Sequence, residues 1–168
     1  MPLLLPPSQS LEVSGPDAVA FVHAQFSSDV SALTDGQWQW SAWLSAQGRV
    51  RAFFRLLRSS GERIILILNG GSAAALQTAL VPYVLRSKVR LHVQSQRALG
   101  YFEPAELREA TGSVPQQQDF VETQSGIALA ATGREPRWYV VENATAATAA
   151  DDQPEALNRW RAADIAAW

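Results

Sequence analysis

The chain has 168 residues and a formal net charge of −2; 47% of its residues are hydrophobic and 18% are charged. This is the composition of a folded globular protein, and the length suits one large domain or two small ones. The small net charge gives no general attraction to nucleic acid or to an anionic membrane. Because cysteine is absent, these residues form no disulfide, thiolate nucleophile or cysteine-based metal site.

The amino-terminal stretch MPLLLPPSQS is not predicted to be a secretory signal peptide. It has no basic segment, and its apolar run consists of three leucines between prolines. No apolar stretch approaches the roughly 18 residues of a membrane-spanning helix. We therefore expect a cytoplasmic protein with no membrane partner. Of the 14 basic residues only Lys88 is a lysine, a bias that indicates a GC-rich bacterial genome.

The first half of the chain is predicted to combine strands with two helices. The first helix follows Gly15-Pro16-Asp17, because proline suits a first helical turn and aspartate suits the positive end of the helix dipole. The second runs from residue 73 to about 84, after the breaking and capping sequence NGGS at 69–72. RIILIL is read as a strand buried on both faces. The strands are expected at 11–14, 37–45, 49–58, 63–68 and 88–93.

The second half is predicted to begin near residue 98 and to form an antiparallel α+β plait. Its helix, at 104–111, begins at Pro104 and ends at Gly112. Its strands are expected at 98–103, 126–132 and 137–143.

We divide the chain into a first α+β domain at 1–95 and a second, ferredoxin-like domain at 96–153, followed by a helix at 154–168. Asp152 is expected to cap this last helix. Its apolar residues recur every three or four positions and end unfinished at Trp168. We therefore expect a larger apolar partner or missing sequence beyond that residue.

The segment QWQWSAWLSAQGRVRAFFRLLR, residues 37–58, is predicted to be a hairpin that turns at Gly48. Side-chain alternation puts Trp43 on the face opposite Trp38 and Trp40. After the turn, alternation places Arg49, Arg51 and Arg55 on one face with Phe53 and Leu57. One face is then a core wall. The other would suit a planar ligand with an acidic tail, or would simply be an exposed face kept soluble by arginine.

Other candidate sites have weaker support in the sequence. The amides of the NGGS segment could hold an anion, although a plain helix cap also explains them. His23 and His92 are far apart, so no metal site is expected. No G-x-S-x-G motif supports a serine triad. Asp151 and Asp152 are read as helix-capping residues.

Four blocks together resemble the YgfZ-type folate-binding proteins, relatives of the glycine-cleavage T-protein. LEVSGPDAVAFVHAQFSSDVSAL is similar to the family pattern L-x-x-x-G-x-D-A-x-x-F-x-x-x-Q-x-x-x-D-V. SAQGRVRAFFRLLR is similar to an A-x-G-R turn followed by an apolar strand. YVLRSKVRL and NRWRAADI are similar to the Y-x-x-x-S-K-V and W-x-x-x-x-I blocks. The four occur in the family's order and spacing over nearly the whole chain.

The resemblance implies an α+β T-protein/YgfZ-like fold, with antiparallel sheets and helices arranged as an incomplete cloverleaf without the carboxy-terminal barrel. It implies tetrahydrofolate or a derivative as the cofactor, and iron–sulfur proteins, including tRNA-modifying enzymes, as client partners. No direct nucleic-acid contact, catalytic residue or metal site is expected. The predicted cofactor-binding residues are Trp160, Arg49, Arg51, Asn69 and Lys88.

Three departures from the family refine this prediction. The segment K-G-C-Y-x-G-Q-E is absent, so we expect an amino-terminal portion of a longer protein. A second folate-linked tryptophan of the family falls near Ser8. The Asp-Asp pair of the T-protein is replaced by Ala52-Phe53, which removes the candidate acid–base group for aminomethyl transfer.

The sequence therefore predicts a non-catalytic, folate-binding accessory protein of iron–sulfur cluster assembly or repair. Two alternatives remain open at this stage. One is a tetrahydrofolate-dependent aminomethyltransferase of the T-protein type. The other is a ligand-free interaction domain that has the same fold.

Overall fold

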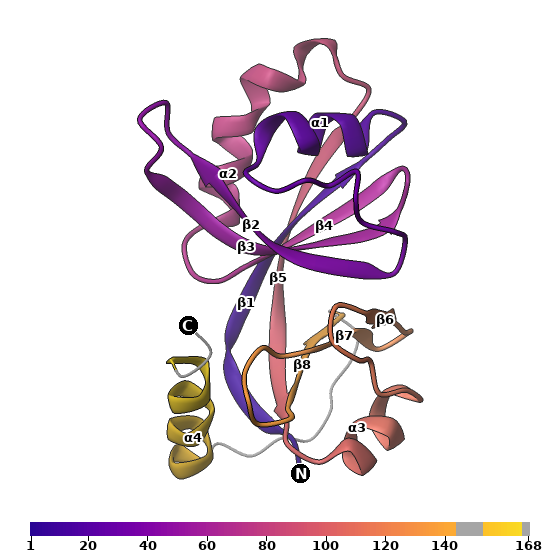
Figure 1. Ribbon diagram of the computed structural model, residues 1–168, viewed down its shortest axis with the longest axis vertical. Helices are drawn as coiled ribbons and strands as arrows, with labels where there is room; N and C mark the ends of the chain where they lie inside the picture. Colours follow the sequence, from indigo (N-terminus) through magenta and orange to yellow (C-terminus); the bar gives the residue numbers. More distant parts are fainter. Residues whose placement is uncertain (144–152, 166–168) are drawn as a thin grey trace. The chain divides into compact units, whose positions relative to one another are not determined.

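The computed structural model describes residues 1–143 and 153–165 (Figure 1). Contacts divide the chain into two packing units, Ser8–Ser95 (the first unit) and Met1–Pro7 with Gln96–Trp168 (the second unit). Strands β1 (Leu3–Ser14) and β5 (Arg90–Tyr101) each contribute residues to both units. The domain boundaries predicted at residues 95 and 153 stay predictions, because packing does not measure whether a segment folds alone.

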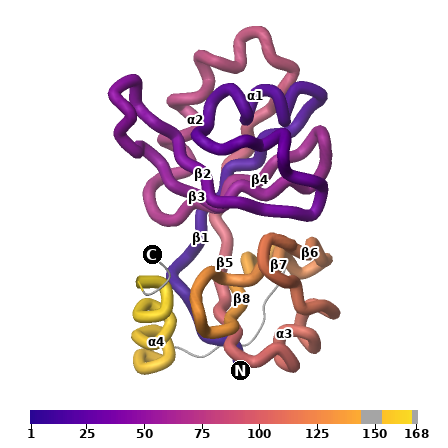
Figure 2. Tube along the Cα trace, viewed as in Figure 1, coloured from indigo at the N-terminus to yellow at the C-terminus, as the bar shows by residue number. Residues whose placement is uncertain are grey.

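In the first unit, five strands are ordered β2-β3-β4-β1-β5, and the pairs β2–β3, β3–β4 and β4–β1 are antiparallel. Two helices cover the same face of these strands (Figures 1 and 2). Besides β1 and β5, the elements of this unit are α1 (Ala18–Gln25), β2 (Gln37–Leu44), β3 (Val50–Ser60), β4 (Arg63–Leu68), α2 (Ala73–Leu80) and the short 3₁₀ helix η1 (Val81–Arg86).

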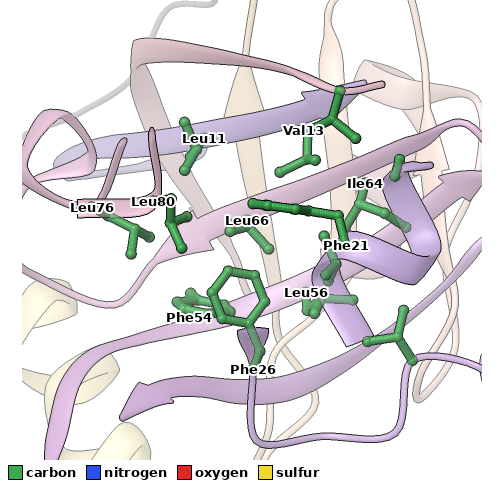
Figure 3. Packing of buried hydrophobic residues seen from close by; sticks show 14 of the residues in the cluster. Leu11, Val13, Phe21, Phe26, Phe54, Leu56, Ile64, Leu66, Leu76 and Leu80 are labelled. Carbon is green, nitrogen blue, oxygen red and sulfur yellow. The ribbon is translucent and has the colours of Figure 1, made fainter. Parts of the chain in front are cut away.

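The core of the first unit lies between this sheet and its two helices (Figure 3). Phe26 meets Phe54 edge to face, with ring centroids 4.8 Å apart, a favoured aromatic geometry. Alternate residues of the strands enter the same core, as the period of two requires. The members labelled in Figure 3 are Leu11, Val13, Phe21, Phe26, Phe54, Leu56, Ile64, Leu66, Leu76 and Leu80.

Strand β4 is buried on both faces, which confirms the prediction made from its continuous apolar run. Ile64 and Leu66 enter the core beneath the helices. Ile65 and Ile67 project from the opposite face and are also buried, at 4% and 0% exposure.

The segment NGGS caps α2, as predicted. The Ser72 hydroxyl accepts a hydrogen bond from the Ala75 amide at 3.2 Å, which satisfies one of the donors that a helix leaves at its amino terminus. The helix ends at Leu80 and not near Val84, and η1 continues the chain from there. Pro82 accounts for the difference, because proline has no amide hydrogen to donate inside an α-helix.

In the second unit the strands are ordered β5-β8-β7-β6, and each neighbouring pair is antiparallel. The strands predicted at 88–93 and 98–103 form one strand, β5. Strand β6 was not predicted, because its three residues lie in a segment read as a polar loop. The elements are α3 (Pro104–Thr111), β6 (Phe120–Glu122), β7 (Gly126–Ala130), β8 (Trp138–Glu142) and α4 (Pro154–Ile165).

Helix α4 is attached to the second unit by Trp160, which is 5% exposed and packs with Leu3, Leu5 and Ala98. Phe102 meets its ring edge to face at 5.7 Å. The predicted apolar stripe does not continue along the helix, since Ile165 is 77% exposed. The predicted Asp152 cap and the expectation drawn from Trp168 lie outside the described residues.

A buried arginine completes this attachment. The Arg137 guanidinium lies 4.7 Å from the centre of the Trp160 ring and donates to the Trp160 carbonyl at 3.1 Å. It also pairs with Asp164 at 2.8 Å and donates to the Thr132 carbonyl at 2.7 Å. Such partners offset much of the cost of burying a charge. Arg137, the residue immediately before β8, therefore connects that strand to two positions on α4.

None of the helices among residues 1–143 and 153–165 is both long enough and apolar enough to span a membrane.

Gly100 lies directly against Trp160, and this contact gives a first prediction. A methyl group added at Gly100 would lie 2.8 Å from the indole ring, and the ring has little room to move because Phe102 and Arg137 pack against it. We expect Gly100→Ala to lower the free energy of unfolding by about 1–3 kcal/mol.

Urea denaturation measures this effect, with Gly61→Ala as the matched control. Gly61 has no neighbour within 4 Å of its added methyl group, so that variant is expected to stay within about 0.5 kcal/mol of the parent. Equal midpoints for the two variants would show that Trp160 does not pack on Gly100.

Candidate functional site

The β2–β3 hairpin contains a β-bulge next to its turn, and this bulge changes the direction of one arginine. The pairing runs regularly to Trp43 opposite Ala52 and then shifts, so that Leu44 pairs with Val50. Arg51 is therefore the extra residue of the bulge, a position that commonly re-aims a side chain. Its guanidinium lies 5.6 Å from the centre of the Trp43 ring.

This geometry corrects the prediction that Arg51 shares a face with Phe53 and Arg55. Strict alternation would have put Arg51 on the face of the sheet that does not carry Trp43. The bulge adds one residue to β3 and so interrupts the alternation. Arg51 and Trp43 instead lie together at the edge of the core that the helices cover.

A pocket of about 390 Å³ opens beside this pair. Its wall comes from the bulge, from the end of β4, from the loop that follows β4 and from the first two turns of α2. Arg51 is the only ionisable residue among the residues that line it. The lining residues are Trp43, Arg51, Ala52, Leu68, Gly70, Gly71, Ser72, Ala75, Leu76 and Ala79. We refer to this site as the Trp43–Arg51 pocket.

The loop between β4 and α2 is held by hydrogen bonds within the protein. The Asn69 amide donates to the Phe53 carbonyl at 2.9 Å. The amide of Ala73 donates to Gln9 Oε1 at 2.8 Å, and the amide of Ala75 donates to Ser72. Because two amides of the first helical turn are already satisfied, the structure favours the helix-cap interpretation of this segment over an anion cradle.

The structure brings only some of the predicted cofactor-binding residues together. Arg51 lines the Trp43–Arg51 pocket, and Asn69 is exposed immediately before the lining residues Gly70 and Gly71. Arg49 is exposed at the hairpin turn and does not line the pocket. Lys88 lines a different cleft.

Trp160 lies in the second unit, and most of its surface is covered by its own packing partners. Ser8, near which the family has another tryptophan, is buried in β1 at 3% exposure. The apolar spacing of the last helix predicted a packed face that includes Trp160, but it gave no sign of the partners Leu3, Leu5 and Ala98.

The mixed arginine–aromatic face predicted for the hairpin exists, but much of it is internal. The Arg55 guanidinium lies 4.5 Å from the centre of the Trp40 ring, and Trp40 stacks on Phe53 at 4.7 Å with an interplanar angle of 9°. Arg55 and Trp38 are 6% and 4% exposed. This part of the face is neither the solvated surface nor the open ligand wall that the sequence suggested.

Ala52 and Phe53, where the resemblance predicts the T-protein's Asp-Asp pair to be replaced, lie on the two faces of β3. Ala52 lines the Trp43–Arg51 pocket, and Phe53 is stacked on Trp40. No carboxylate lines this pocket. The described residues also contain no cluster of three or more His, Asp or Glu side chains that could hold a metal ion.

Comparison with known proteins gives the fold but not a family. No protein-family model matches the chain. An uncharacterized protein of Haemophilus influenzae is 29% identical over 92 residues, a match that covers 55% of this chain and 33% of that protein.

Among solved structures, the glycine cleavage system aminomethyltransferase T from Bartonella henselae superposes with a TM-score of 0.70 at 19% sequence identity. The chain has a T-protein-like fold. The match covers 80% of this chain but only 39% of the aminomethyltransferase, so the chain spans about two fifths of that protein. The predicted α+β class and T-protein-like fold are confirmed, and membership of the YgfZ family remains a proposal.

The position of Arg51 gives a second prediction. Arg51→Ala removes the guanidinium that lies beside the Trp43 ring, so we expect it to shift the indole N–H signal of Trp43 in a ¹H–¹⁵N spectrum. Trp43→Phe identifies that signal. Because Arg51 is exposed, Arg51→Ala should change the free energy of unfolding by less than about 1 kcal/mol.

Arg49→Ala is the control, since Arg49 is also exposed but lies at the hairpin turn and does not line the pocket. A Trp43 signal that moves as far in Arg49→Ala as in Arg51→Ala would contradict the bulge geometry.

Proposed function

We propose that this chain is part of a YgfZ-type folate-binding protein that supports the assembly or repair of iron–sulfur clusters without catalysing a transfer reaction. One observation carries the proposal. Within a T-protein-like fold, the Trp43–Arg51 pocket offers an aromatic wall and one cation but no carboxylate.

The pocket residues suit a folate. Reduced folates join a pterin ring and a benzoyl ring to a glutamate tail. The Trp43 ring and the apolar side chains of Leu68 and Leu76 offer contact surface for the rings. Arg51 can pair in a bidentate manner with a tail carboxylate. Gly70 and Gly71 bear no side chains, and the space beside their α-carbons is open, which leaves room for a ligand to enter.

The non-catalytic role rests on what the pocket lacks. Transfer of an aminomethyl group to folate requires a group that orients or protonates the reacting amine. Ala52 stands where the resemblance places the first acid of the T-protein pair, and a methyl group can neither donate nor accept a proton. The ligand is therefore proposed to be bound and presented, not converted.

The iron–sulfur role comes from the family resemblance. These 168 residues contain no cysteine, so a cluster would be ligated by the client protein or by residues outside them. The clients proposed are bacterial iron–sulfur enzymes, including those that modify tRNA.

An aminomethyltransferase is the second candidate, because the structurally similar Bartonella henselae protein is one. Tetrahydrofolate-dependent release of an aminomethyl group from a lipoyl carrier would favour that activity over the accessory role. The third candidate, a ligand-free interaction domain, predicts neither folate binding nor transfer.

Titration with 5-formyltetrahydrofolate, followed by tryptophan fluorescence, tests the proposed binding and gives a third prediction. We expect a saturable change for the parent chain and at least about tenfold weaker binding for Arg51→Ala, since a charge-assisted hydrogen bond to the tail is lost. Arg51→Lys should fall between the two because it keeps the charge but loses the planar fork.

Arg86→Ala is the matched control, because Arg86 is an exposed arginine of the same unit that does not line the pocket. Trp160→Ala is a poor probe of binding, since it removes a packing residue of α4. An absence of saturable signal, both in this chain and in a longer product of the same reading frame, would refute the folate proposal.

A further inference from the structure

A second cleft lies in the first unit, where the turn after β1 meets the chain that leads into β5. Its volume is about 480 Å³. It shares no lining residue with the Trp43–Arg51 pocket. The residues that line it are Ser14, Gly15, Pro16, Ser87, Lys88, Val89 and Arg90. We refer to it as the Lys88–Arg90 cleft.

The backbone that forms this cleft is held closely on both sides. Gly15 has a φ of +134°, and a β-carbon there would lie 2.1 Å from the Lys88 carbonyl oxygen, so only glycine permits this approach. The Asp17 carboxylate accepts a hydrogen bond from the Lys88 amide at 2.8 Å. The Gly15 amide donates to the Glu62 carbonyl, also at 2.8 Å.

Two cations that flank a buried valine are both exposed at this cleft. Val89 is 9% exposed and belongs to the core cluster. Its neighbours on either side, Lys88 and Arg90, are both exposed, and both line the cleft. Because the two residues line one cleft of about 480 Å³, both side chains can reach one ligand.

Neither cation is neutralised within residues 1–143 and 153–165. Two arginines of the same unit are paired within the protein, Arg58 with Asp35 at 2.8 Å and Arg63 with Glu12 at 2.9 Å. No corresponding ion pair joins Lys88 or Arg90 to a described carboxylate. The cleft therefore keeps two charges for an external partner, on a backbone that need not reorganise to receive it.

We propose that the Lys88–Arg90 cleft binds the phosphate group of a small phosphorylated ligand. Lysine contributes up to three N–H donors and arginine five, and Ser14 and Ser87, which carry hydroxyl groups, line the same cleft. A phosphate presents more acceptor oxygens and more negative charge than a carboxylate, so it can engage both cations and a hydroxyl at once. This site is distinct from the proposed folate pocket.

The Asp17 carboxylate contacts the backbone of this cleft at Lys88, and it provides a sharp test. Its charge opposes an incoming anion, while its oxygen holds the Lys88 amide. Asp17→Asn keeps an acceptor oxygen for that hydrogen bond and removes the negative charge. Phosphate binding should therefore become several-fold tighter in Asp17→Asn.

Calorimetric titration with inorganic pyrophosphate tests this proposal and gives a fourth prediction. We expect saturable binding to the parent chain and at least about tenfold weaker binding for Lys88→Ala and for Arg90→Ala. Lys88→Arg should retain most of the affinity because the charge stays in place. Arg86→Ala, an exposed arginine four residues from Arg90 that does not line the cleft, should bind like the parent.

Two further titrants separate this site from general charge attraction and from folate. Tricarballylate carries three carboxylates and no phosphate, and it should bind more weakly than pyrophosphate. 5-Formyltetrahydrofolate binding should be unchanged in Lys88→Ala. The proposal is overturned if pyrophosphate does not bind, if Arg86→Ala weakens it as much as Lys88→Ala, or if Lys88→Ala weakens folate binding but not pyrophosphate binding.

Discussion

The antiparallel pairing of β3 with β4 determines which residues can meet at the Trp43–Arg51 pocket. Phe54 pairs with Leu68 at the end of the regular ladder, and the Asn69 amide extends it by one further bond to Phe53. Both strands are buried on both faces over most of this pairing. A shift of one residue would exchange every inward and outward side chain, so the register is strongly constrained. It places the bulged Arg51 beside the glycine loop that precedes α2.

Three arginines show why a count of charges says little about function in this chain. Arg137 and Arg55 are buried against tryptophan rings, where their planar cations contribute to packing. Arg51 also lies over a tryptophan, but it is exposed and borders a pocket. Only this last arrangement leaves the guanidinium available to a ligand. Of these three arginine–tryptophan contacts, two are buried in the packing of the protein, and we propose that the third binds a ligand.

Much of the fold could be predicted from the sequence where local chemistry decides the structure. The apolar run of β4, the Ser72 cap and the Gly112 end of α3 depend on neighbouring residues alone. The bulge at Arg51 could not be predicted, since it arises from pairing between two strands and has no local signal. The packing partners of Trp160 could not be predicted for a similar reason, because Gly100 lies 60 positions away in the sequence. The candidate pocket depends on the bulge, so the sequence named Arg51 as a candidate but could not indicate the pocket that this residue lines.

The central claim is that this T-protein-like fold holds a folate beside Trp43 without an acid–base group to act on it. A crystal structure of the chain soaked with 5-formyltetrahydrofolate tests that claim most directly. We predict ligand density against the Trp43 ring, a tail carboxylate within hydrogen-bonding distance of Arg51, and no Asp or Glu side chain of this chain at the reacting amine. Ligand density elsewhere, with an empty Trp43–Arg51 pocket at full ligand occupancy, would contradict it.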